Sequence, residues 1–328
     1  MHTPRLTFAL ALAAAAVASG AAPAAADPIT GPIAGPSTAD GVLVYSQQDA
    51  DGLWSLHQRD RAGALRRLPV ARSQNPFDVD MGRTADNEIV ALYSRCATVC
   101  RIYELAVDSG RERLVPGVHA RGHSETMPTL HHGVLGFQRH RAGEIPGEFS
   151  GKSGSYRLIA LRRGERSRQV KALRSEQTVT GADLSARGLA LSTYRGEPGR
   201  LEVSVQVKPA NRPFRTLQLA ASGELSEVRV TPPSWRGNDV YWGYARAYDV
   251  PSRLLLRARV TAGGTDLRQT NAPNPLGERG ALISGVAADD VNSEQPLWIA
   301  TTLYDEWDGD DRTGLDAYPV DSLRFFDR

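Results

Sequence analysis

The length, composition and charge of this chain exclude a disordered protein and a nucleic-acid binder. Its 328 residues are 41% hydrophobic and 23% charged, which is close to the average for a protein with a buried core. The formal net charge of +2 is too small to hold a polyanionic nucleic acid, so we expect no nucleic-acid partner. The 31 glycines and 20 prolines favour many short strands joined by turns over a few long helices.

Residues 1–26 have the pattern of a cleavable secretory signal peptide. Arg5 gives a basic start, residues 6–16 are apolar, and residues 24–26 are the small residues of a cleavage site. The apolar part is shorter than the ~20 residues of a membrane-spanning helix, and it holds no cysteine that could carry a lipid. The alanine-rich leader and the predominance of arginine over lysine suggest a GC-rich bacterial genome. We therefore expect a secreted or periplasmic-type location and no transmembrane segment in the mature chain.

The rest of the chain is predicted to form a proline-rich segment, residues 27–38, followed by a single β-domain, residues 39–328. Because proline is tolerated at an unpaired sheet edge, we expect residues 27–38 to supply an outer strand that helps to close the fold. The domain is expected to be monomeric.

The two cysteines lie at the end of a predicted hairpin. Cys96 and Cys100 separate the strand-like residues 88–93 and 101–105, so the two thiols face each other across the hairpin end. In an oxidising compartment this pair predicts a disulfide. A lone pair of cysteines does not make a structural zinc site, and we expect no metal and no cofactor.

A repeated unit runs through the β-domain. Each unit has a turn with glycine, aspartate or asparagine, an apolar strand, a polar loop and a second strand, such as residues 201–207 with their apolar and polar alternation. The turns recur at intervals close to the ~40 to 50 residues of a four-stranded propeller blade. The turn residues are Gly41, Asn87, Gly133, Gly188, Asn238 and Gln295. We therefore predict an all-β fold, a six-bladed β-propeller of four-stranded antiparallel blades. A β-sandwich, the alternative, would not need six similar units.

Two turn motifs connect this repeat with a known family. Residues 84–87 read Thr-Ala-Asp-Asn before an apolar strand, and residues 108–110 read Asp-Ser-Gly. They resemble the Ser-Pro-Asp-Gly-type and Asp-x-Gly-type turns of TolB-like, WD-repeat-like β-propellers. The resemblance covers residues 39 to about 325, although the complete Ser-Pro-Asp-Gly turn does not occur. It implies the propeller fold and a role as an interaction scaffold.

Four units place an arginine where the apolar strand ends. If the blades superpose, these side chains lie at equivalent loops on one face of the disc, where guanidinium groups could bind a carboxylate or a phosphate. Alternatively, each arginine pairs with an acid or a carbonyl and only supports the fold. The candidate ligand-binding residues are Arg95, Arg139, Arg195 and Arg246.

Three further features have simpler explanations than a functional site. The acidic residues 305–311, with Asp316, do not fit an EF-hand frame and are predicted to be a solvated hairpin tip. Residues 147–153 imitate a phosphate-binding loop but lack its first glycine and the helix that follows. A histidine-rich stretch could hold a metal or respond to pH, but two of its members are adjacent and would point to opposite faces of a strand. Its members are His119, His123, His131, His132 and His140.

The leading functional hypothesis is a non-enzymatic scaffold that binds a protein or a small acidic ligand through loops on one face. The main alternative is a secreted propeller glycan hydrolase or lyase, for which carboxylates ~5 to 10 Å apart across the channel would be evidence. Separated or salt-bridged carboxylates would favour the scaffold. A third hypothesis is a structural component of a cell-envelope assembly, marked by a large exposed apolar patch. The carboxylates that the enzyme would need are Asp78, Asp80, Asp183, Asp289 and Asp290.

Overall fold

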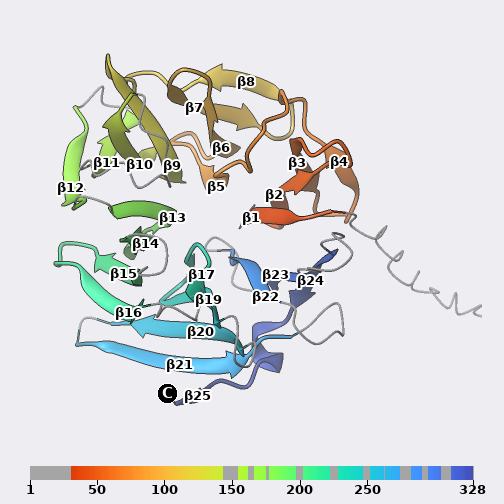
Figure 1. Cartoon of the computed structure of the whole chain (residues 1–328), viewed down its shortest axis with the longest axis vertical. Helices are drawn as coiled ribbons and strands as arrows, with labels where there is room; N and C mark the ends of the chain where they lie inside the picture. The colour runs from red at the N-terminus through yellow and green to blue at the C-terminus, as the bar shows by residue number, and fades with distance from the viewer. Residues whose placement is uncertain are drawn as a thin grey trace, which may run out of the picture.

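The chain folds into six small antiparallel sheets that stand around a common centre like the blades of a propeller (Figure 1). The computed structural model describes residues 31–142, 154–161, 166–174, 177–196, 202–221, 228–246, 252–261, 263–273, 282–289, 295–303 and 312–327. In this described part the chain is almost entirely strand and turn, and it contains no helix long and apolar enough to cross a membrane. The predicted all-β, six-bladed fold is confirmed.

The first three blades each contain four consecutive strands, ordered from the centre outward. Blade 1 consists of β1 (Ile33–Ala39), β2 (Val42–Gln48), β3 (Trp54–Arg59) and β4 (Leu65–Arg67). Blade 2 consists of β5 (Asp80–Arg83), β6 (Ile89–Cys96), β7 (Cys100–Ala106) and β8 (Arg111–Leu114). Blade 3 consists of β9 (His123–His131), β10 (Val134–Arg141), β11 (Ser155–Ala160) and β12 (Arg168–Ala172).

The last three blades depart from this plan in two places. Blade 4 has β13 (Gln177–Ser185), β14 (Gly188–Arg195), β15 (Glu202–Pro209) and β16 (Arg215–Ala221). In blade 5 the inner strand is split into β17 (Val228–Val230) and β18 (Ser234–Arg236), followed by β19 (Asp239–Arg246), β20 (Ser252–Val260) and β21 (Thr265–Asn271). Blade 6 has β22 (Leu282–Ala287), β23 (Leu297–Leu303) and β24 (Arg312–Tyr318). After the short helix η2 (Val320–Ser322), β25 (Phe326–Asp327) pairs with β21 at the edge of blade 5.

Among the strands that the structure describes, none is shared between the first and last blades of the ring. We expected residues 27–38 to supply an outer strand, and that prediction was wrong. The segment instead becomes the innermost strand β1, which pairs with β2 of its own blade. Pro36 lies in this inner strand, beside Gly285 of blade 6. Because the inner strand is the edge of its sheet, the blade does not need the amide hydrogen that proline lacks. In the described residues, blade 1 therefore meets blade 6 through side-chain packing and through a hydrogen bond to a side chain of blade 6.

Six apolar clusters fill the spaces between the blades, one at each blade-to-blade interface. The alternation of side chains along each strand explains this arrangement, because successive residues face the two neighbouring blades. Leu92 packs toward blade 3, for example, while Tyr93 packs toward blade 1. Counting the described residues only, the cluster between blades 6 and 1 has the fewest buried members, among them Tyr45 and Ala287.

Polar side chains on the inner strands form a second set of contacts around the ring. At one register position of blades 1 to 5, a side-chain oxygen accepts a hydrogen bond from a backbone amide of the next blade. Met81 N donates to Ser37 Oγ (2.8 Å), and Leu130 N donates to Asp80 Oδ2 (3.0 Å). We call this set of acceptors the belt. Its members are Ser37, Asp80, Thr129, Asp183 and Ser234.

The belt follows a strict register. Each donor is the residue directly after the belt position of its own blade, as Leu184 follows Asp183 and donates to Thr129 Oγ1 (2.8 Å). Blade 6 breaks the pattern, because Ala287 occupies its belt position and offers no acceptor. Asp289 Oδ2 accepts from Gly41 N of blade 1 instead (2.9 Å). The interface where the ring closes thus has both the smallest apolar cluster and a different polar contact.

Two glycines let the inner strands approach one another closely. A Cβ at Gly181 of blade 4 would lie 2.4 Å from the Pro232 ring of blade 5, and a Cβ at Gly285 would lie 2.3 Å from Pro36. Both glycines lie two residues before the belt position, where the pairing of the inner strand shifts by a bulge. A larger residue at either place would push neighbouring blades apart.

The belt predicts a stability cost for the loss of a single hydroxyl group. Thr129→Val keeps the shape of this fully buried side chain but leaves the Leu184 amide without its acceptor. We expect the free energy of unfolding, measured by urea denaturation, to fall by about 1 to 3 kcal/mol. The matched control Thr216→Val, at an exposed position of β16, should change it by less than about 0.5 kcal/mol. Equal effects of the two substitutions would contradict a structural role for the belt.

Candidate functional site

The aspartates proposed for the channel lie on or beside the inner strands, as predicted. Asp80 is in β5 and Asp183 is in β13, whereas Asp289 follows β22 directly. All three accept a backbone amide hydrogen of the next blade: those of Leu130, Trp235 and Gly41 respectively. Asp80 Oδ1 also accepts from Ser37 Oγ (3.0 Å). These carboxylates hold neighbouring blades together. Asp290 lies outside the described residues.

Asp78 makes the same kind of contact two residues before the belt position. Its carboxylate accepts from Ser94 N (2.6 Å), Ser94 Oγ (2.7 Å) and Met127 N of blade 3 (2.6 Å). Burial raises the pKa of this carboxyl, and the hydrogen bonds from Ser94 and Met127 oppose that rise. Asp78 therefore ties β6 of its own blade to the middle of β9, the next inner strand.

Tyr156 lies among three of these aspartates. Its hydroxyl donates to Met127 O (3.0 Å), and the whole side chain is buried. Burial, together with the negative charges of Asp80, Asp183 and Asp78, raises the pKa of Tyr156 well above its usual value. The centre of the ring is thus a hydrogen-bonded network with a tyrosine that stays protonated.

The four candidate arginines lie at the upper ends of the second strands of blades 2 to 5. We call upper the face of the disc that holds the loops between second and third strands, because antiparallel strands bring these loops and the blade-to-blade connections to the same side. In each second strand, one residue pairs with the belt position of the inner strand. Arg95 and Arg139 lie three residues after that residue along the chain, and Arg195 and Arg246 lie five residues after it. The four positions therefore share one sheet face, toward the preceding blade, but at two different heights.

Arg95 is engaged within blade 2. Its Nη1 donates to Glu112 Oε1 (2.9 Å), and its guanidinium lies 3.9 Å from the centre of the Tyr103 ring. The Tyr93 hydroxyl donates to the same carboxylate, and burial together with Glu112 raises the pKa of Tyr93. The carboxylate and the ring fix the orientation of Arg95.

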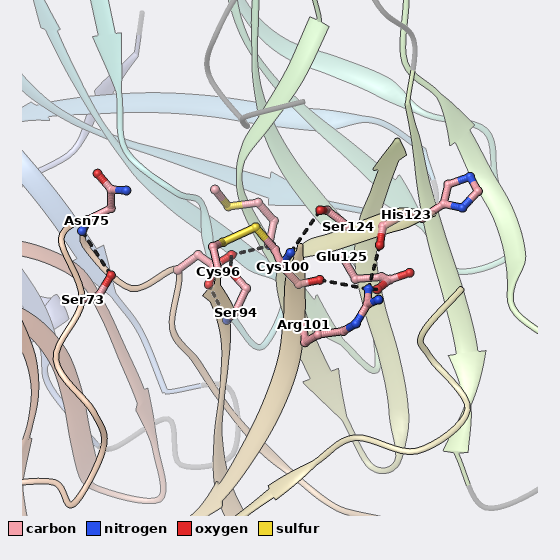
Figure 2. Close-up of a disulfide and its surroundings, with 11 residues drawn as sticks. Ser73, Asn75, Ser94, Cys96, Cys100, Arg101, His123, Ser124 and Glu125 are labelled. Atoms are coloured by element: carbon pink, nitrogen blue, oxygen red, sulfur yellow. Dashed lines mark hydrogen bonds and ion pairs between the residues drawn. A yellow bond between two sulfur atoms is a disulfide. The ribbon is translucent and has the colours of Figure 1, made fainter. Parts of the chain in front are cut away.

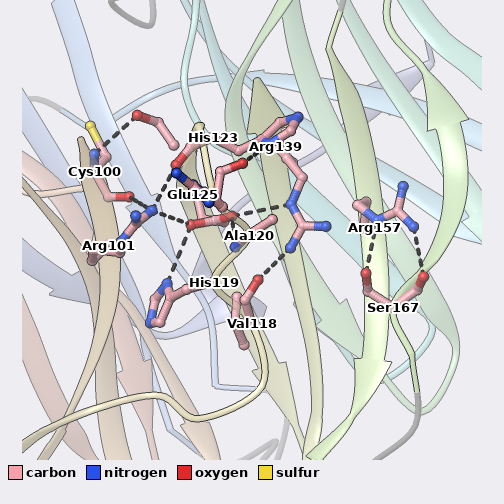
Figure 3. A network of polar contacts seen from close by, with 12 residues as sticks. Cys100, Arg101, Val118, His119, Ala120, His123, Glu125, Arg139, Arg157 and Ser167 are labelled. Atoms are coloured by element: carbon pink, nitrogen blue, oxygen red, sulfur yellow. Dashed lines mark hydrogen bonds and ion pairs between the residues drawn. The ribbon is translucent and has the colours of Figure 1, made fainter. Parts of the chain in front are cut away.

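Arg139 belongs to a buried cluster around Glu125 between blades 2 and 3 (Figure 3). Glu125 has no exposed side-chain surface, and it accepts from Arg139 Nε (3.1 Å) and Arg101 Nη1 (2.9 Å). Ala120 N also donates to it (3.1 Å), and His119 Nδ1 lies 3.3 Å from its second oxygen. Two guanidinium groups compensate the cost of burying this carboxylate. Because Arg101 comes from β7 and Glu125 from β9, the cluster links two blades.

Of the other two arginines, Arg195 has a described side chain and Arg246 does not. Arg195 ends β14, is half-buried, and has no hydrogen-bond or ion-pair partner among the described residues. Arg246 ends β19, but its side chain is not among those described. The structure therefore places Arg95 and Arg139 in carboxylate contacts, while the ligand-binding role of all four remains a prediction.

The hairpin of blade 2 carries the disulfide on the same upper face (Figure 2). Cys96 and Cys100 pair across the ends of β6 and β7 with Cα atoms 3.9 Å apart, and their sulfur atoms are bonded. Cys100 N donates to Ser124 Oγ of blade 3 (3.0 Å), which attaches the hairpin to the next blade. The disulfide is the one predicted from the sequence, and it fits an oxidising compartment.

The histidine-rich stretch does not form a metal site in the part of the chain that the structure describes. No group of three or more His, Cys, Asp or Glu side chains there is placed to hold an ion. We predicted that His131 and His132 would point to opposite faces of a strand, and that prediction was wrong. Their rings lie 4.6 Å apart, because His132 adopts a turn with φ of 44°. The acidic residues 305–311 and the glycine-rich residues 147–153 lie outside the described residues, whereas Asp316 is exposed in β24.

Large apolar side chains are exposed only singly in the described ranges. They lie on the outer strands of four different blades and form no continuous patch of the kind that the envelope-assembly hypothesis requires. These residues are Leu65, Leu114, Leu219 and Phe326.

Two features were not anticipated from the sequence. The belt has a partial signal, since Ser37, Thr129 and Ser234 each stand four residues before a turn position of the repeat. Asp80, with its longer turn, breaks that spacing. The Glu125 cluster has no signal in the spacing of its members, because it joins Arg101 and Arg139 from different blades.

No protein-family model matches this chain, and no curated protein matches its sequence. Solved structures match its fold. A puromycin-hydrolysing peptidase from Mycobacterium tuberculosis is 13% identical, with a TM-score of 0.50 over 90% of this chain and 52% of that chain. A puromycin hydrolase is also 13% identical, with a TM-score of 0.52 over 91% of this chain and 53% of that chain. TolB from Acinetobacter baumannii is 12% identical, with a TM-score of 0.48 over 85% of this chain and 64% of that chain.

These similarities establish the fold and nothing narrower. The chain spans about half the length of the peptidases it matches and 64% of TolB. The six-bladed propeller that the expected resemblance implies is present, whereas no sequence family is identified for the chain.

The Glu125 cluster predicts that two of the candidate arginines differ in their effect on stability. Arg139→Ala removes one of the two guanidinium groups from a buried carboxylate, so we expect the free energy of unfolding to fall by about 1 to 3 kcal/mol. Arg195→Ala, the matched change in the next blade, should alter it by no more than about 0.5 kcal/mol. Urea denaturation monitored by tryptophan fluorescence measures both. An unchanged stability of Arg139→Ala would show that Glu125 does not depend on this contact.

Proposed function

We propose that the protein is an exported, non-enzymatic binding propeller that takes an acidic ligand at its upper face. The observation that carries this proposal is the engagement of the central aspartates. Asp78, Asp80, Asp183 and Asp289 each accept a backbone amide hydrogen from the next blade. Their carboxylates serve as supports between blades, the arrangement that favours a scaffold over a pair of catalytic acids.

The upper face supplies the groups for binding. Arg195 and Arg246 occupy equivalent positions on consecutive blades, and Arg195 has no described partner that would neutralise it. A guanidinium group binds carboxylates and phosphates through two parallel hydrogen bonds. Arg95 and Arg139 bring further positive charge to the same sheet face, while Glu112 and Glu125 hold them in place. We infer that Arg195 and Arg246 make the direct contacts.

The proposal is tested by titrating the protein with citrate and with inorganic phosphate in a calorimeter. In the double variant Arg195→Ala/Arg246→Ala, affinity for the bound probe should fall about tenfold or more, because charge-assisted hydrogen bonds are lost. The control Arg111→Ala/Arg324→Ala removes two exposed arginines elsewhere and should bind like the wild type. Equal affinities of all three proteins, or an equal loss in the control, would contradict the proposal.

A separate assay tests the enzymatic alternative. The wild-type protein is incubated with polygalacturonate and other glycans, and new reducing ends are measured. We expect none. Release of reducing ends that disappears in Asp78→Asn, the aspartate whose pKa burial raises, would replace the scaffold with a glycan hydrolase or lyase.

A further inference from the structure

The small net charge of the chain conceals a strong local excess of basic side chains. The described parts of blades 3 and 4 contain twelve lysines and arginines but only three acidic residues: Glu125, Asp183 and Glu202. Glu125 is enclosed by Arg101 and Arg139, and Asp183 accepts an amide of blade 5. Two of these three acids are thus committed within the fold.

Blades 1, 2 and 5 pair some of their arginines with acidic side chains. In blade 1, Asp51 pairs with Arg72, and in blade 5, Asp239 pairs with Arg259. In blade 2, Glu104 pairs with Arg113. Among the described residues of blades 3 and 4, the only ion pairs are those that end on Glu125. Within the described residues of these two blades, the remaining basic side chains therefore form no ion pair.

A bulge in the outer strand of blade 3 directs two cations to the same side. Lys171 pairs with Tyr156, and Arg168 pairs with Leu158, because the register of β12 shifts between them. Tyr156 and Leu158 both belong to the apolar cluster between blades 3 and 4. Arg168 and Lys171 therefore both face blade 4, although an unbroken strand would place them on opposite faces.

Lys171 connects this strand to a turn of blade 4. Its Nζ donates to Gln206 Oε1 (2.8 Å) and lies 5.0 Å from the centre of the Phe214 ring. The turn between β15 and β16 that contains Phe214 also carries Arg212, and Lys208 Nζ at the end of β15 donates to the backbone oxygen of Arg212. We call this group the basic seam. Its members are Arg168, Lys171, Lys208 and Arg212.

Two cations of blade 3 lie near other cations, which adds to the effect of their burial. Burial and the nearby Arg174 lower the pKa of Lys171. Burial and the nearby Arg139 likewise lower the pKa of Arg157, whose guanidinium donates to the neutral oxygens of Ser167 (Figure 3). Repulsion between cations of this kind is relieved when an anion binds.

We propose that the basic seam binds an anionic polysaccharide. An extended chain that repeats carboxylate or sulfate groups can meet a row of arginines and lysines along the rim of two blades. A protein partner would require an apolar interface centre, and the exposed large apolar side chains of the described residues lie singly. Single-stranded nucleic acid requires exposed aromatic rings for stacking, and the ring at the seam, Phe214, is covered by Lys171.

Heparin, a sulfated polysaccharide, is the probe for this proposal. The charge-reversal pair Arg168→Glu/Arg212→Glu should weaken heparin binding about tenfold or more relative to the wild type, and added salt should weaken the wild-type complex. The control pair Arg111→Glu/Arg324→Glu changes the net charge equally at exposed sites away from the seam and should retain binding within about twofold. Since all four side chains are exposed, both pairs should melt at the wild-type temperature.

Three outcomes would overturn the proposal. Equal losses in the seam and control pairs would mean that only net charge matters. Double-stranded DNA bound as tightly as heparin would mean that the surface is a nucleic-acid site. Loss of heparin binding in Arg195→Ala/Arg246→Ala, with the seam pair unaffected, would assign the polyanion to the upper face. The basic seam lies at the opposite ends of the strands from the upper face. A failure of the polysaccharide proposal therefore leaves the proposed function of the upper face unchanged.

Discussion

The whole structure depends on one recurring contact: a side-chain oxygen on an inner strand that accepts a backbone amide hydrogen from the next blade. Inner strands face one another around the axis, and their amides would be buried without a partner unless side chains or water supplied one. Serine, threonine and aspartate meet this need at five successive interfaces, from Ser37 to Ser234. The sixth interface has Ala287 at this position, which offers no acceptor, so we expect the ring to open first where its ends meet.

This use of polar groups determines where chemistry is available. The aspartates at the centre are engaged in joining blades, and Tyr156 among them remains protonated. The groups that stay available lie away from the axis, at the ends of strands on the upper face and along the rim of blades 3 and 4. The distribution suits a protein that presents surfaces to partners while its centre maintains the ring.

The sequence was informative where the physical rule is local. Turn residues such as Gly41 and Gly133 and the alternation of apolar residues predicted the repeat, and the spacing of Cys96 and Cys100 predicted the disulfide. Contacts between blades could not be predicted in the same way, because they depend on register across segments about fifty residues apart. Arg139 illustrates this limit: its position at a strand end was foreseen, but its engagement with Glu125 required the three-dimensional packing of blades 2 and 3.

Native-state amide hydrogen exchange tests the central claim most directly. The donors to the belt, the amides of Met81, Leu130, Leu184, Trp235 and Ala288, should exchange only through global unfolding. The amide of Gly41, bound to Asp289 at the closing interface, should exchange earlier, through a partial opening between blades 6 and 1. Exchange of the belt amides at the rate of exposed loops, or protection of Gly41 beyond theirs, would contradict the account.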